Sequence, residues 1–142
     1  MKALKFGVLS LLAVTPALSG ELVVTIAGVK KPTGTVLVTL KSSEASWNSN
    51  TDSVAVQKFA AQKVVADKGT LVVNFGDLPA GTYAVMVLHD ENDNHKMDTG
   101  VMGIPSEAYG FSNNPHVMRK PYFSETKFDV GADPVKLAIQ LH

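Results

Sequence analysis

Residues 78–98 read Leu-Pro-Ala-Gly-Thr-Tyr-Ala-Val-Met-Val-Leu-His, followed by Asp-Glu-Asn-Asp-Asn-His-Lys-Met-Asp. The part from Thr82 to His89 is apolar on both of its alternating faces, which predicts a strand at the centre of its sheet with a cover on each side. The part that follows is a loop dense with oxygen-bearing side chains. This stretch therefore predicts a buried strand that delivers a polar loop to one end of the fold.

Alternating and β-branched runs elsewhere predict further strands. The clearest are 35–41 and 135–141, in each of which every second residue is apolar. Residues 54–61 fit no single period, so we expect them to be irregular, whereas residues 67–69 predict a tight turn between the two strands of a hairpin. The predicted strands cover 22–26, 35–41, about 62–66, 70–75, 82–89, 122–130 and 135–141.

This pattern predicts the fold class. About seven short strands, frequent turn residues and the lack of a long helical period indicate an all-β fold, a single antiparallel β-sandwich of immunoglobulin-like or transthyretin-like type. Residues 42–53 are polar and predict a surface connection with at most one helical turn near Trp47. We expect the long loop at about 90–116 to cover a sheet, because the strand before it is apolar on its outer face as well.

The N-terminal residues resemble a secretory signal. A basic start, an apolar run over 6–13 and small residues at Ala17 and Ser19 predict cleavage after Ser19. The apolar run is shorter than the roughly 20 residues that a spanning helix needs, and no other stretch is long enough. We therefore expect a signal peptide at 1–19 and one exported domain at 20–142, periplasmic or secreted.

Composition excludes several classes of function. The chain holds 13 basic residues, 13 acidic residues and no cysteine. Removing Lys2 and Lys5 with the signal leaves 13 − 2 = 11 basic residues and a net charge near −2, so charge gives no reason to expect nucleic acid or an anionic membrane as partner. Thiol nucleophiles and zinc–thiolate sites are excluded.

The sequence also contains no recognisable catalytic motif. No nucleophile elbow, phosphate-binding glycine loop or Ser/His/Asp set is recognisable, which favours a protein that is not an enzyme.

The polar loop has the spacing of a cation site. Asp90, Asn92, Asn94 and Asp98 occupy relative positions 1, 3, 5 and 9, and the backbone carbonyl of Lys96 falls at position 7. This spacing directs alternate oxygen atoms at one hard cation. The sequence therefore predicts a calcium site formed by these five residues.

The loop is not an EF-hand, because Val101 stands at position 12, where an EF-hand has its bidentate glutamate. A carboxylate from elsewhere, such as Glu107 or Asp93, would have to complete the coordination shell. The alternative is a turn without metal that is held by hydrogen bonds from its Asp and Asn side chains.

A second candidate site lies in the loop aromatics. Tyr109 and Phe111 could stack against a glycan or small ligand, and Trp47 could do the same in the polar connection before it. The alternative is that Trp47 folds over the end of the core, and that Phe111 and Ile104 plug the sheet. The candidate ligand-binding residues are Trp47, Glu107, Tyr109, Phe111, Asn113 and Asn114.

Two longer motifs resemble known families. Residues 75–85 are similar to the strand–turn–strand element of transthyretin-like and carboxypeptidase-regulatory-like sandwiches. Residues 78–85 combined with 89–94, Met97-Asp98, Gly103-Ile104-Pro105 and 109–114 resemble the bacterial exported family catalogued as domain of unknown function 2141. The resemblance covers nearly all of the chain after the signal and implies the same β-sandwich, but it brings no established activity. The typical loop of that family has glycine where this chain has His95.

Together these observations predict an exported, non-enzymatic β-sandwich module with a structural calcium loop, whose partner is of unknown identity, such as a glycan or an envelope component. The alternative is a glycan- or small-ligand-binding domain that uses the loop aromatics. An enzyme of unrecognised type is the third reading, for which Asp90 and Asp98 would be the candidate acid and base.

Overall fold

The computed structural model describes residues 18–142, so nearly all of the predicted signal peptide lies outside the described residues. Within the described range the chain forms eight strands and a few short helices. The strands are β1 (Ser19–Ala27), β2 (Thr35–Lys41), β3 (Ala55–Ala60), β4 (Leu71–Pro79), β5 (Gly81–Asp90), β6 (Tyr109–Phe111), β7 (Phe128–Val130) and β8 (Val135–Gln140). The helices are α1 (Glu44–Trp47), α2 (Ala61–Ala66) and α3 (Phe123–Thr126), with a 3-10 turn, η1, at Val101–Gly103.

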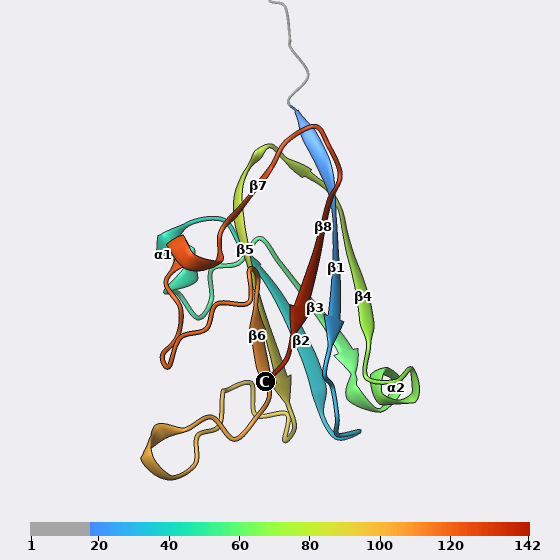
Figure 1. Ribbon diagram of the computed structural model, residues 1–142, viewed down its shortest axis with the longest axis vertical. Coiled ribbons are helices and arrows are strands. Elements are labelled where there is room, and N and C mark those ends of the chain that lie inside the picture. The colour runs from blue at the N-terminus through green and yellow to red at the C-terminus, as the bar shows by residue number, and fades with distance from the viewer. Residues whose placement is uncertain (1–17) are drawn as a thin grey trace, which may run out of the picture.

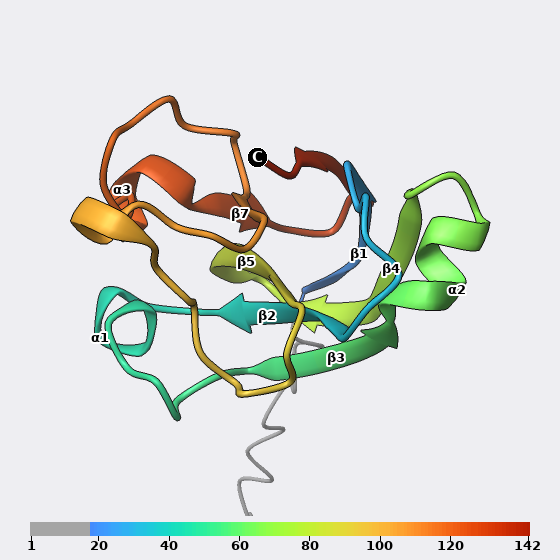
Figure 2. The same ribbon diagram turned by 90° about the horizontal axis from the view of Figure 1, so that it is seen from below.

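The strands form two sheets that pack face to face (Figures 1 and 2). One sheet has the order β4-β1-β8 and the other the order β3-β2-β5-β6, with β7 pairing to the opposite end of β5. The pair β1–β8 is parallel, from Leu22 opposite Val135 to Ala27 opposite Gln140, and the other strand pairs are antiparallel. The prediction of a mostly β protein with two packed sheets is confirmed, with eight strands where about seven were predicted. The prediction of purely antiparallel sheets is wrong, because β1 and β8 are parallel.

The region between β2 and β4 also differs from the prediction. Residues 55–60 form the edge strand β3, in which half-buried and exposed residues alternate, and the predicted strand at 62–66 is the helix α2. Ala61 and Val64 lie three residues apart on its buried face, the spacing of one helical turn. The turn at 67–69 therefore ends a helix, and Gly69, at φ +72°, donates its N–H to the carbonyl of Val64.

The core lies between the sheets. Alternation in β2 holds as predicted, because Val36, Val38 and Leu40 are fully buried there. Opposite them β1 contributes Leu22, Val24 and Ile26 with the same period of two. The remaining core members are Val29, Ala61, Val64, Val73, Leu78, Tyr83, Val85, Val87, Val130, Ile139 and Leu141.

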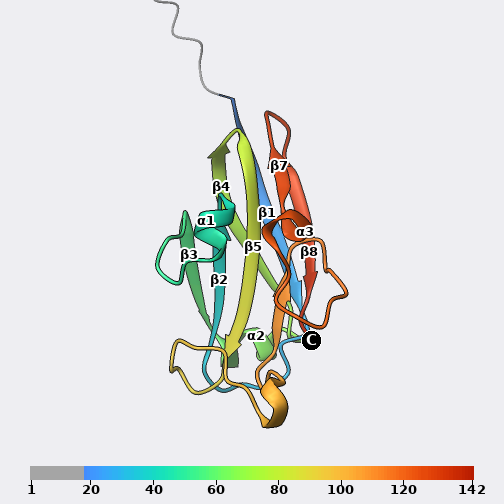
Figure 3. The ribbon, with the colours of Figure 1, turned by 90° about the vertical axis from the view of Figure 1, so that its left-hand side faces the viewer.

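The outer face of β5 is covered by the α1 and α3 regions and not by the loop that follows β5. Figure 3 shows β5 running between α1 and α3, which lie on either side of it, while the segment after Asp90 extends past the end of the sandwich. Val101, Met102 and Ile104 in that segment are 85%, 92% and 64% exposed. The expectation that the whole of 90–116 covers a sheet is therefore wrong, and so is the role of Ile104 as a plug. None of the helices within residues 18–142 has the length and apolarity needed to cross a bilayer.

Candidate functional site

The polar loop starts where β5 leaves the sandwich. Asp90, the last residue of β5, pairs with Thr35 of β2 and is 1% exposed. The backbone of Asp90 and Glu91 lies against Gly34, whose φ of +79° turns the chain into β2. The first residue of the predicted calcium loop is thus fixed by two neighbouring strands, which gives the loop a rigid base.

The carboxylate of Asp90 organises the turn that follows. Its Oδ1 accepts the N–H of Asn94 at 3.2 Å, and its Oδ2 accepts the N–H of His95 at 2.8 Å. His95 has a φ of 62°, a left-handed conformation that glycine adopts at lower cost. The position that is usually glycine in similar loops therefore needs positive φ here as well, and His95 adopts it.

Three of the predicted ligand side chains converge. The Nδ2 atoms of Asn92 and Asn94 donate to the two carboxylate oxygens of Asp98, the second at 2.7 Å. The Oδ1 atoms of the same asparagines accept the N–H groups of Asn94 and Lys96. The loop therefore brings Asn92, Asn94 and Asp98 together, with Asp90 behind them as the support of the turn.

Glu107 has a role that the sequence did not indicate. It is 5% exposed, and its two oxygens accept the N–H groups of Glu91 and Asp98, the latter at 2.9 Å. Glu107 thus joins the two ends of the loop, and it also lines a second hollow with Lys31 and His89. Its predicted roles as a pocket residue and as an additional calcium ligand stay predictions. Asp93 accepts the hydroxyl of Thr35 at 2.7 Å. Among residues 18–142, no three His, Cys, Asp or Glu side chains are grouped so that they could hold a metal ion.

The predicted ligand-binding aromatics separate into two places. Tyr109, Phe111 and Asn114 line a hollow of about 270 Å³ beside β6, together with His116 and Arg119. Asn113 is directed elsewhere, because its Nδ2 donates to the carbonyls of Glu125 and Lys127. The structure therefore places three of the six predicted residues on one hollow.

Trp47 is not on that hollow and is 1% exposed. Its ring lies 5.8 Å from that of Phe111 and 6.4 Å from that of Phe123, both at tilted angles. Its indole N–H donates to the carbonyl of Pro121 at 2.9 Å. The idea that Trp47 stacks on a ligand is therefore wrong, and the alternative that it folds over the core is the one observed.

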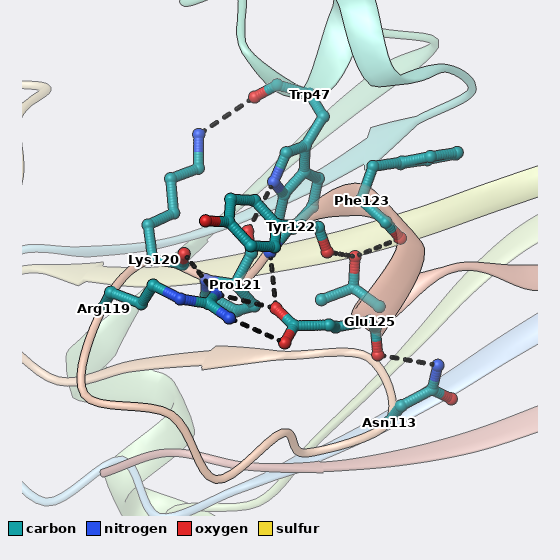
Figure 4. Close-up of polar contacts among 9 residues, drawn as sticks. Trp47, Asn113, Arg119, Lys120, Pro121, Tyr122, Phe123 and Glu125 are labelled. Carbon is teal, nitrogen blue, oxygen red and sulfur yellow. Dashed lines mark hydrogen bonds and ion pairs between the residues drawn. The ribbon is translucent and has the colours of Figure 1, made fainter.

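A polar network holds the segment over Trp47 (Figure 4). Arg119 donates to both oxygens of Glu125, at 2.8 and 2.9 Å, and Glu125 also accepts the N–H of Tyr122 at the start of α3. The hydrogen bonds from Arg119 are the main cause that lowers the pKa of Glu125 to about 2, followed by the bond from Tyr122. Lys120 donates to the carbonyl of Trp47, and its partial burial lowers its pKa. The sequence did not signal this network, because residues 122–130 resemble a strand.

Comparison with known proteins identifies the family. A family model described as "uncharacterized protein conserved in bacteria", domain of unknown function 2141, matches residues 24–138. The chain belongs to this family, as its motifs suggested. No curated protein and no solved structure matches the chain significantly.

Proposed function

We propose that this family member is an exported, non-enzymatic β-sandwich module whose 90–98 loop binds calcium and thereby fixes the segment that projects from the end of the sandwich. The proposal depends on one observation, the convergence of Asn92, Asn94 and Asp98 in front of the buried Asp90. The strand–turn–strand element at 75–85 supports placing the sandwich among immunoglobulin-like and transthyretin-like folds.

The donor set fits a hard cation. Two carboxylates, two amides and the carbonyl of Lys96 supply oxygen ligands of the kind that calcium prefers, and water would complete the shell. An ion would take the place of the hydrogen bonds from the Nδ2 atoms of Asn92 and Asn94 to Asp98, so both amides would have to turn their oxygens toward it. Further carboxylates at this end add negative charge near the loop, because Asp93 lies in it and Glu107 lies against it, while Glu91 is paired with Lys31. Each carboxylate oxygen has two lone pairs, so Asp90 can hold the turn and still face an ion. The role of the ion would be structural.

Calcium titration into chelator-treated protein tests the proposal. We expect binding with a Kd of roughly 10⁻⁴–10⁻³ M, as in other extracellular modules with few carboxylates. At a calcium concentration of about ten times Kd the folded state would gain about 1.4 kcal/mol, which raises the Tm by roughly 5 °C. Isothermal titration and thermal melts measure the two effects.

The variants Asp98→Asn and Asp129→Asn sharpen this test. Asp98 lies at the point of convergence, whereas Asp129 is an exposed aspartate that accepts the hydroxyl of Thr82. Asp98→Asn should weaken calcium binding at least tenfold, a loss of about 1.4 kcal/mol, and Asp129→Asn should leave it unchanged. Absence of heat at millimolar calcium, with an unchanged Tm, would rule the calcium proposal out.

A second candidate function is binding of a glycan or other small ligand at the hollow beside β6. It is favoured by the position of Tyr109, Phe111 and Asn114 on one hollow. The test is a glycan array followed by titration of any hit into Tyr109→Ala. A binding role predicts lost affinity at a Tm within a few degrees of wild type, whereas a packing role predicts a large fall in Tm, since Tyr109 lies 5.7 Å from Phe111.

A further inference from the structure

Residues 98–106 form a small hairpin that projects from the end of the sandwich (Figures 1 and 3). The N–H of Ser106 donates to the carbonyl of Asp98, Thr99 bridges Pro105, and the N–H of Gly100 donates to the carbonyl of Ile104 at 2.7 Å. The 3-10 turn η1 closes the hairpin at its tip. This backbone pairing makes the hairpin a defined element and joins its base to the polar loop.

The tip of the hairpin is apolar and faces solvent. Val101 and Met102 are 85% and 92% exposed, and Ile104 is 64% exposed. Residues 99–106 include no charged side chain. Met102 adopts a φ of 63°, which is unfavourable for a side chain of this type. Clustered apolar side chains at the end of a projection mark an interaction site more often than scattered ones do.

The shape of the tip indicates its partner. A stable protein–protein interface buries about 800 Å² on each side, which needs a broad surface and not one turn. A bilayer accepts any apolar shape to a depth of about 5–10 Å and requires only that no charge is carried in. We infer that Val101, Met102 and Ile104 insert into the interfacial region of a phospholipid bilayer and bind the protein reversibly to its surface.

This insertion is apolar and not electrostatic. The chain has a near-neutral charge, and the carboxylates of the 90–98 loop lie at the base of the hairpin, so anionic lipid is not the expected attraction. The inference goes beyond the calcium proposal and does not require it. Calcium at the base would only reduce the negative charge near the membrane.

Sedimentation with phosphatidylcholine vesicles tests the inference, using two matched double variants. Val101→Ser/Met102→Ser removes two tip side chains, and Val72→Ser/Met118→Ser removes a valine and a methionine that are 62% and 105% exposed elsewhere. We expect the tip variant to lower the vesicle partition coefficient at least tenfold and the control variant to change it less than twofold. Partition should persist in 0.5 M salt.

A fluorescent probe gives an independent readout. Tryptophan in Met102→Trp should shift its emission to the blue when phosphatidylcholine vesicles are added, and Trp47 contributes a constant background because it is buried. Three results would each overturn the inference. The first is an equal fall in the vesicle partition coefficient of the two double variants, and the second is that the wild type does not sediment with vesicles at millimolar lipid. The third is an unchanged emission wavelength of Met102→Trp when vesicles are added.

The same assay separates the two proposals. If Asp98→Asn loses calcium binding but keeps its vesicle partition, both proposals hold as independent functions. If the wild type gives no calcium heat but partitions in chelator, only the calcium proposal fails. If calcium heat is present and the wild type does not partition, only the inference about the membrane fails.

Discussion

Replacing Trp47 with alanine is expected to lower the free energy of unfolding by about 3–5 kcal/mol. The indole ring is 1% exposed and packs between Phe111 and Phe123, which come from β6 and α3. Truncation leaves a cavity and removes the hydrogen bond to the carbonyl of Pro121. The segment that carries α3 would lose its main apolar contact with the outer face of the sheet. Urea denaturation followed by circular dichroism measures the loss.

Two further variants test whether the burial of Trp47 causes the predicted loss of stability. Trp47→Phe keeps most of the apolar contact but leaves the Pro121 carbonyl without its donor, so we expect a loss of about 1–2 kcal/mol. Tyr122→Ala truncates an aromatic side chain that is 62% exposed on the same segment and should cost less than about 1 kcal/mol. A loss below about 1 kcal/mol for Trp47→Ala would contradict the role of this residue as the anchor of the cover.

Replacing Gly34 with alanine is expected to destabilise the fold by at least about 3 kcal/mol. Its φ of +79° is costly for any residue with a Cβ atom, by roughly 1–2 kcal/mol. An added Cβ would also lie against the carbonyl oxygen of Asp90 and 2.7 Å from the carbonyl carbon of Glu91. These are backbone atoms, so they can move only by shifting the base of the polar loop. Urea denaturation should show the lower free energy of unfolding, and calcium titration should show weaker binding by the displaced loop.

Gly103 provides the matched control for this prediction. Its φ is +72°, nearly that of Gly34, but an added Cβ would meet nothing within 4 Å. Gly103→Ala should therefore cost only the conformational term, about 1 kcal/mol or slightly more, and should leave calcium binding in place. Equal losses in the two variants would show that the contact between Gly34 and the loop base is unimportant.

The sequence predicted the elements whose patterns are local. The alternation in 35–41 and the run in 82–89 that is apolar on both faces correspond to β2 and β5. A strand buried on one face has alternating apolar residues and a strand buried on both faces has continuous ones, so the sequence of the strand itself predicts its burial. The strand predicted at about 62–66 is part of the helix α2, because Val64 and Val65 suit either structure and only the packing of Ala61 and Val64 selects the helix. The parallel direction of β8 could not be read from a single strand.

In the candidate site too, the features set by local spacing were predicted and those set by long-range contacts were not. The spacing of Asp90, Asn92, Asn94 and Asp98 is local, and the structure brings the last three together. Glu107 acts through two backbone N–H groups nine and sixteen residues away, and no sequence period marks such a partner. The burial of Trp47 depends on residues more than seventy positions later, at Pro121 and Phe123. Long-range contacts of this kind need the folded chain.

The parallel pairing of β1 with β8 also sets how the domain would respond to tension. These strands lie first and last in the fold, and residues 22–27 are in register with residues 135–140. A force that pulls the two ends apart would run along both strands, so the hydrogen bonds between them would be sheared together and not opened one after another. The parallel pairing of β1 with β8 therefore gives the domain a shear geometry that resists separation of its two ends.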